Sequence, residues 1–164
     1  MSYRAPVAYI AFTLKHGVGL AQALRQGHYA DLGESDVDAV LEEAGRFATD
    51  VIAPLNRTGD QHGTPFKDGA VTMPPGWKEA YRAWWQGGWN GLAAPAQWGG
   101  QGLPHAVNTA CNEMWNASAM AFGLGPLLTM SAVESLAAHG SEALKAAYLP
   151  QLVSGEWMGD QERR

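Results

Sequence analysis

Histidines are the residues of this sequence best suited to bind a metal or to move a proton. They are His16, His28, His62, His105 and His139. None has the Glu-x-x-His spacing of di-iron helical bundles, and the chain has no His-Glu-x-x-His or paired Cys-x-x-Cys motif. We therefore predict no metal site and interpret the histidines as exposed or helix-capping side chains.

Three further features resemble parts of catalytic or cofactor sites. Gly99-Gly100-Gln101-Gly102 lacks the preceding strand and the following helix of a phosphate-binding loop, so we interpret it as a structural turn. Cys111 lies among apolar residues of an expected helix, which favours an inert core thiol over a nucleophile. Glu113 and Glu134 are interpreted as solvated rather than catalytic carboxylates. The pattern alone therefore assigns no catalytic or cofactor-binding residue.

The elements that carry these residues are predicted to be helical throughout. Residues 36–53 form the clearest helix, with Ser35 as its N-cap and Pro54 as its stop. Residues 58–75 are expected to be a surface loop. Other helices are expected over residues 7–14, 20–24, 76–86, from Pro104 to a break at Gly123 and Gly125, from Pro126 to 139, and, after a cap at Ser141, over 142–149 ended by Pro150. The predicted fold class is all-α, a helical bundle of about six helices.

Composition narrows the class of protein. Hydrophobic residues make up 46% of the 164 residues and charged residues 16%, which excludes intrinsic disorder. The net charge of −5, with no basic cluster longer than Arg163-Arg164, disfavours nucleic acid and anionic membranes as partners. No apolar run approaches the roughly 20 residues of a membrane span, and no leader is evident. With its single cysteine, the chain is expected to be cytoplasmic.

Four groups of segments, in order along the chain, carry a resemblance to a known family. They are residues 1–7 with 10–15, residues 42–48 with 52–57, residues 88–95 with 99–104, and residues 139–145 with 148–152 and 155–157. Together they resemble the N-terminal helical domain of the acyl-CoA dehydrogenase family. The likeness is to larger members with an N-terminal extension, similar to methylthiopropanoyl-CoA dehydrogenases.

The resemblance implies three parts: an N-terminal extension at 1–34, the family's helical domain at 35–159, and a non-family tail at 160–164. In the family, a β domain and a C-terminal four-helix domain follow and hold FAD between them, and a glutamate of the C-terminal part removes the α-proton of an acyl-CoA. After Gly159 this chain departs from the family's Leu-Thr-Glu-Pro-x-x-Gly-Ser-Asp segment. The expectation is therefore a truncated chain that binds no flavin and is inactive alone, with the missing domains as its partners.

The resemblance also implies that the helical domain closes one side of the acyl slot. We predict that Gly123, Leu127, Leu128 and Met130 line this slot, and ordinary core packing is the alternative. Without its partner domains, the chain is expected to expose an apolar face and to self-associate. The Trp-rich segment 84–98 and the helix around Met114-Trp115 are expected to form that face. The alternatives to an enzyme's domain are a free-standing helical interaction module and an inactive remnant.

Overall fold

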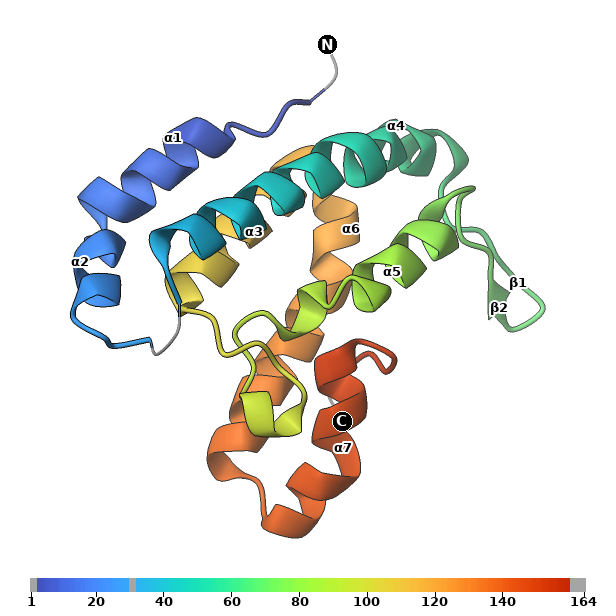
Figure 1. Ribbon diagram of the computed structural model, residues 1–164. Helices are drawn as coiled ribbons and strands as arrows, with labels where there is room; N and C mark the ends of the chain where they lie inside the picture. Colours follow the sequence, from blue (N-terminus) through green and yellow to red (C-terminus); the bar gives the residue numbers. More distant parts are fainter. Residues whose placement is uncertain (1–2, 30–31, 160–164) are drawn as a thin grey trace.

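The computed structural model describes residues 3–29 and 32–159, which form a body of helices joined by short loops (Figure 1). The α-helices are α1 (Val7–Phe12), α2 (Leu20–Arg25), α3 (Glu34–Phe47), α4 (Ala53–His62), α5 (Trp77–Gln86), α6 (His105–His139) and α7 (Glu142–Ser154). The remaining elements are the π-helical turns η1 (Thr13–Gly17) and η2 (Ala48–Ile52), the 3-10 turns η3 (Trp89–Gly91) and η4 (Ala96–Trp98), and the antiparallel strands β1 (Phe66–Lys67) and β2 (Ala70–Val71). The all-α prediction is confirmed.

Helices α3 and α4 run into one another as one long rod, joined by η2 (Figure 1). The prediction that Pro54 stops the helix is wrong. The π-helical turn places Pro54 in the first turn of α4, where a missing N–H leaves no helical hydrogen bond unmade. The N-cap is Gly33 rather than Ser35, and the backbone N–H of Gly33 donates to Asp36 Oδ2 at 2.7 Å.

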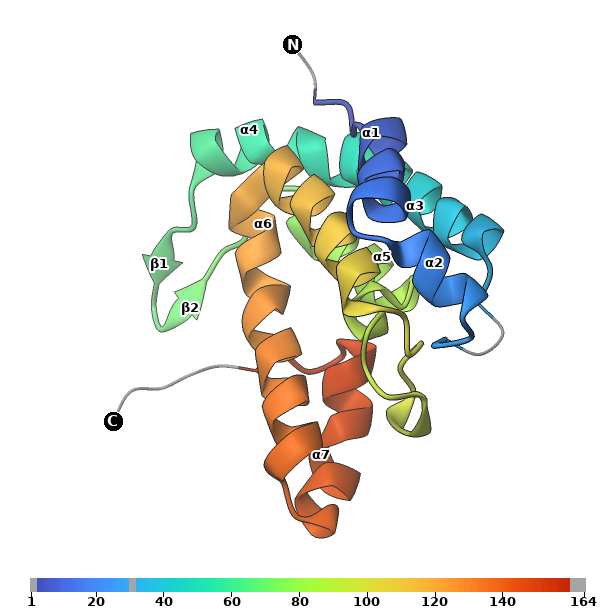
Figure 2. The same ribbon diagram turned by 90° about the vertical axis from the view of Figure 1, so that its left-hand side faces the viewer.

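The loop expected over residues 58–75 is shorter than predicted. Helix α4 continues to His62, and β1 and β2 form a small hairpin that projects from the helical body (Figures 1 and 2). Phe66 pairs with Val71 across this hairpin, and both side chains are exposed. Strands of two residues are too short to show alternating hydrophobicity, so sequence patterns could not predict them.

Helix α6 bends sharply at Ala119, whose backbone is non-helical (φ −158°, ψ 94°). We call residues 105–118 its first arm and residues 120–139 its second arm. The predicted break at Gly123 and Gly125 is therefore wrong, and Pro126 lies inside the second arm rather than at its start. The reason is tertiary packing, because Trp115 before the bend and Phe122 after it both contact Trp84 of α5.

The two arms lie side by side and form a narrow V (Figure 2). At 1.5 Å per residue, the stretches from the bend to His105 and to Glu134 are each about 21–23 Å long. His105 Nδ1 and Glu134 Oε1 nevertheless lie 3.6 Å apart, and Asn112 Nδ2 lies 3.7 Å from Met130 Sδ. The arms therefore run in nearly opposite directions and stay within side-chain reach of each other as far as His105 and Glu134.

The core is built around tryptophans from three elements. Trp84 and Trp115 are 0% exposed, and their rings meet edge to face with centroids 4.2 Å apart. Trp89 packs against Trp115 in the same manner, with centroids 5.4 Å apart. The prediction that this aromatic segment and Met114-Trp115 form an exposed face is wrong, because Met114, Trp84 and Trp115 are fully buried.

A second, smaller core joins α7 to the second arm of α6. Leu149 and Val153 of α7 are buried against Val133. Because these two residues flank Pro150, helix α7 passes through the proline and ends at Ser154, so the prediction that Pro150 ends this helix is wrong. The predicted cap is confirmed, since the backbone N–H of Leu144 donates to Ser141 Oγ at 3.3 Å.

The second arm of α6 leaves an apolar stripe uncovered by other described residues. Met120, Leu124, Leu127 and Leu128 recur at helical spacing and are all exposed. By length and composition alone, α6 is long and apolar enough to cross a membrane. The sequence analysis predicted no such segment. A core helix passes the same test, and α6 is bent into two antiparallel arms that carry much of the core. We therefore interpret α6 as a core helix.

Candidate functional site

The four residues predicted to line an acyl slot lie on two faces of the second arm. Gly123 and Met130 are buried toward the first arm, where Gly123 lies against the amide of Asn116 and Met130 against Asn112. Leu127 and Leu128 point outward and are 45% and 39% exposed. The structure does not bring the four together in one cavity, and their role in substrate binding stays a prediction.

A mostly apolar hollow lies between α5 and the second arm of α6. Its volume is about 490 Å³. The residues that line it are Met73, Trp77, Lys78, Tyr81, Arg82, Trp85, Ala121, Phe122, Gly125, Pro126, Glu156 and Met158. We call it the α5–α6 hollow. Its size lies within the roughly 300–1,000 Å³ range of small-molecule sites, and its walls are mostly apolar and aromatic, as such sites require.

One wall of the hollow is a single face of α5. Lys78, Tyr81, Arg82 and Trp85 recur at intervals of three and four residues, so they share that face. Trp77 anchors the start of the helix by packing on Gly59 of α4, where an added Cβ would lie 2.7 Å from the indole ring. Gly59 therefore lets α4 and α5 approach closely enough to set this wall.

The turn after α7 covers one side of the hollow. Gly155 has φ +84°, a left-handed conformation that favours glycine, and its carbonyl accepts a hydrogen bond from the Tyr81 hydroxyl at 2.8 Å. The backbone N–H of Gly159 donates to the buried Thr129 Oγ1 at 2.9 Å. These two anchors hold Met158 over the hollow, 3.3 Å from the position of a Cβ on Gly125.

Tyr81 is a structural donor in this site. Burial raises the pKa of the Tyr81 phenol above its ordinary value of 10.0, so the hydroxyl stays protonated near neutral pH and keeps its bond to Gly155. The sequence analysis assigned neither Tyr81 nor Trp85 to a ligand site, and it did not name Met158. The spacing along α5 was a usable signal for the first two, whereas Met158 was out of reach once Pro150 was taken to end the last helix.

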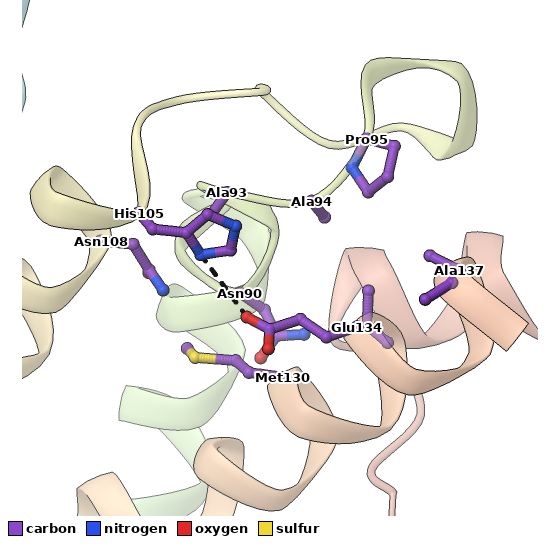
Figure 3. Close-up of a pocket in the computed structure, with 11 residues that line it drawn as sticks. Asn90, Ala93, Ala94, Pro95, His105, Asn108, Met130, Glu134 and Ala137 are labelled. Atoms are coloured by element: carbon purple, nitrogen blue, oxygen red, sulfur yellow. Dashed lines mark ion pairs between the residues drawn. The ribbon is translucent and has the colours of Figure 1, made fainter.

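A second, more polar hollow of about 430 Å³ opens between the two arms of α6 and residues 90–95 (Figure 3). His105, Asn108 and Glu134 surround it, and Met130 lines its base. The His105 and Glu134 side chains are 72% and 62% exposed, so their contact is an open surface pair. Such an exposed pair contributes little to stability.

Among residues 3–29 and 32–159, the chemistry of the site is that of binding rather than catalysis. No group of three or more histidine, cysteine or acidic residues is arranged to hold a metal there. Cys111 is buried, and burial raises the pKa of its thiol to about 12, so it is a poor nucleophile. Glu113 and Glu134 are exposed, as predicted. The arrangement can bind an apolar chain, and we assign no reacting group to it.

Comparison with known proteins places these observations in a family. Residues 34–156 match the model of the acyl-CoA dehydrogenase N-terminal domain. The chain is 42% identical over 159 residues to 3-methylmercaptopropionyl-CoA dehydrogenase of Ruegeria pomeroyi, a match that covers 97% of this chain and 27% of that protein. It is 34% identical to (2S)-methylsuccinyl-CoA dehydrogenase of Cereibacter sphaeroides, over 84% of this chain and 24% of the relative.

A third relative, the mitochondrial isovaleryl-CoA dehydrogenase of Oryza sativa, is 31% identical over 89% of this chain and 34% of its own length. The chain thus spans about a quarter to a third of the curated relatives it matches. The family model covers the helices that build both hollows, from α3 to α7. This chain belongs to the acyl-CoA dehydrogenase family and corresponds to the helical N-terminal domain of its members.

Proposed function

We propose that this chain serves as the N-terminal domain of an FAD-dependent acyl-CoA dehydrogenase, where it supplies one wall of the slot for the acyl group. The observation that carries the proposal is the α5–α6 hollow, an apolar cavity bordered by the exposed stripe of the second arm. Apolar walls suit the alkyl part of an acyl thioester, and each methylene buried there contributes about 0.8 kcal/mol to binding.

The four residues that we predicted from the sequence take different roles in this proposal. Leu127 and Leu128 face outward beside the hollow and are available to contact an acyl chain or a neighbouring domain. Gly123 and Met130 would act indirectly, because they pack between the two arms and so set the position of the second arm. A bulky residue at Gly123 is expected to displace Asn116 first, and to shorten the accepted acyl chain if the second arm moves.

The chemistry of dehydrogenation is assigned to the rest of the complete enzyme. Oxidation at the α and β carbons needs a base for the α-proton and an acceptor for the β-hydride, which FAD supplies when bound. We place neither function on a residue of this chain. The isolated chain is therefore expected to be colourless and to show no acyl-CoA dehydrogenase activity.

A chimeric enzyme tests the proposal. The matching first quarter of the Ruegeria pomeroyi enzyme is replaced by residues 3–159 of this chain, and the product is assayed for FAD content and for acyl-CoA-dependent dye reduction. We expect a yellow protein with measurable activity, because the 42% identity extends over nearly the whole chain. A folded chimera without flavin, or one with flavin and no activity toward any acyl-CoA, would contradict the proposal.

A wall variant of the same chimera tests the role of the hollow. Phe122→Ala removes a large apolar side chain from the wall, so we expect KM for medium-chain acyl-CoA to rise more than kcat falls. Phe66→Ala, in the hairpin, is the control for loss of a ring outside the hollow, because Phe66 is 71% exposed and does not line it, whereas Phe122 is 4% exposed. Equal kinetic constants for the two variants would remove the hollow from the acyl slot.

A further inference from the structure

Two cationic side chains at the rim of the α5–α6 hollow are not used by the function proposed above. Lys78 and Arg82 lie one helical turn apart on the face of α5 that lines the hollow. Both are exposed, and neither forms a salt bridge with any of the residues that the structure describes. Their charges are therefore available to a ligand.

The opposite rim carries Glu156, which is exposed and pairs with neither cation within the salt-bridge distance of 4.0 Å. Among the described residues that line the hollow, two are positive and one is negative, and Glu79 of the same helix does not line it. This balance stands out in a chain whose net charge is −5. The field at the mouth therefore favours an anion over a cation of the same size.

The interior of the hollow has the opposite character. Trp85, Phe122, Pro126 and Met158 present apolar surface, and the Tyr81 hydroxyl is engaged by Gly155. A ligand that fits an apolar interior and a cationic rim has an apolar chain and one anionic head group. We propose that the α5–α6 hollow binds an anionic amphiphile of the medium-chain carboxylate class, with its head between Lys78 and Arg82 and its chain against Trp85 and Phe122.

This site requires only residues of this chain, so it stands or falls separately from the flavoenzyme assignment. Lys and Arg both suit a carboxylate, and a hydrogen bond to a charged group is about twice as strong as a neutral one. Loss of both cations is expected to weaken the complex by about tenfold or more, whereas a neutral ligand of the same chain length should not respond.

Titration calorimetry of the whole chain with dodecanoate below its micellar concentration, at low ionic strength, is the test. We expect saturable binding of one dodecanoate per chain, weaker binding of dodecylammonium, and about tenfold weaker dodecanoate binding by the double variant Lys78→Gln, Arg82→Gln. Dodecanol should bind the wild-type chain and the variant equally. Added salt should weaken dodecanoate binding and leave dodecanol binding unchanged.

The matched control is the double variant Arg25→Gln, Arg46→Gln, which removes the same total charge from exposed residues of α2 and α3 that do not line the hollow. It should bind dodecanoate like the wild-type chain. Absence of dodecanoate binding overturns the proposal. So does equal affinity for dodecanol and dodecanoate, or an equal loss in the two double variants. An active chimera with any of these results would leave the flavoenzyme assignment intact.

Discussion

Trp115 is the residue whose removal should damage this domain most. Its side chain is fully buried, and its ring meets those of Trp84 and Trp89 edge to face at 4.2 and 5.4 Å. Truncation of a buried tryptophan to alanine typically costs about 3–5 kcal/mol, and each aromatic pair adds about 0.5–1.5 kcal/mol beyond area burial. We therefore expect Trp115→Ala to lower the free energy of unfolding by about 5 kcal/mol, at the upper end of the usual range.

Trp115→Phe separates packing from hydrogen bonding at the same position. The indole Nε1 of Trp115 is buried without a hydrogen-bond partner among the described residues, and an unsatisfied buried donor costs about 1–3 kcal/mol. Phenylalanine removes that donor while keeping an aromatic ring, so we expect it to lose less than half as much stability as alanine.

Urea unfolding followed by circular dichroism measures these differences. For a domain of this size, each kcal/mol corresponds to about 2–4 °C in Tm, so Trp115→Ala should melt about 10–20 °C lower. Trp157→Ala is the control, since Trp157 is 47% exposed and should change stability by less than about 1 kcal/mol. Similar losses for Trp115→Ala and Trp157→Ala would refute the assignment of Trp115 to the centre of the core.

Three further predictions concern the surface, the N-terminal segment and the cysteine. Leu127→Glu should shift sedimentation of the isolated chain toward monomer, because it places a charge in the exposed apolar stripe of α6, whereas Phe66→Glu in the hairpin should shift it less. Gly45→Ala should speed amide exchange in α1, because the new Cβ collides with the Val7 side chain; unchanged exchange would show that Val7 can move aside. The native Cys111 thiol should not react with a disulfide reagent at pH 8, and should react on unfolding. Because burial raises the pKa of the Cys111 thiol from 9.0 to about 12, stability should fall as pH rises from about 9 to 12. Cys111→Ala should reduce this slope and leave the part that comes from the Tyr3 and Tyr81 phenols, whose pKa values burial also raises.

Helical spacing and capping residues predicted the fold class, whereas the aromatic pattern did not show whether the tryptophans would lie in the core or on the surface. Four of the seven tryptophans fall within Trp77 to Trp89, and the structure buries Trp84 completely and Trp89 almost completely. The burial of these tryptophans depends on the bend at Ala119, which brings both Trp115 and Phe122 against the ring of Trp84 in α5. No residue type at 117–121 marks a bend, so local propensity could not place it.

Proline and glycine gave the least reliable boundaries, for a physical reason visible in three helices. Pro54 falls in a first turn because η2 adds a residue to the preceding turn, and Pro150 is carried by the burial of Leu149 and Val153. Gly123 lies inside a helix because the amide of Asn116 occupies the space beside it. Pro54 avoids the cost of a helical proline because it lies in a first turn, whereas packing outweighs a cost of about 3 kcal/mol for Pro150 and about 1 kcal/mol for Gly123.

The bend in α6 also explains how one helix can contribute both to the core and to an exposed apolar surface. A straight helix of 35 residues would be about 52 Å long and could bury only one stripe along its length. Folded at Ala119, the helix packs against α3, α4 and α7, and its second arm meets α5 through Phe122 and α7 through Val133 while it keeps another side free. That free side carries Met120, Leu124, Leu127 and Leu128, and proteins that act alone seldom leave such a stripe uncovered. If the chain is a free-standing module, it should stay monomeric in sedimentation at high protein concentration. If it is a domain that normally contacts other domains, it should self-associate, and Leu127→Glu should reduce the association. The same sedimentation experiment therefore distinguishes the two hypotheses.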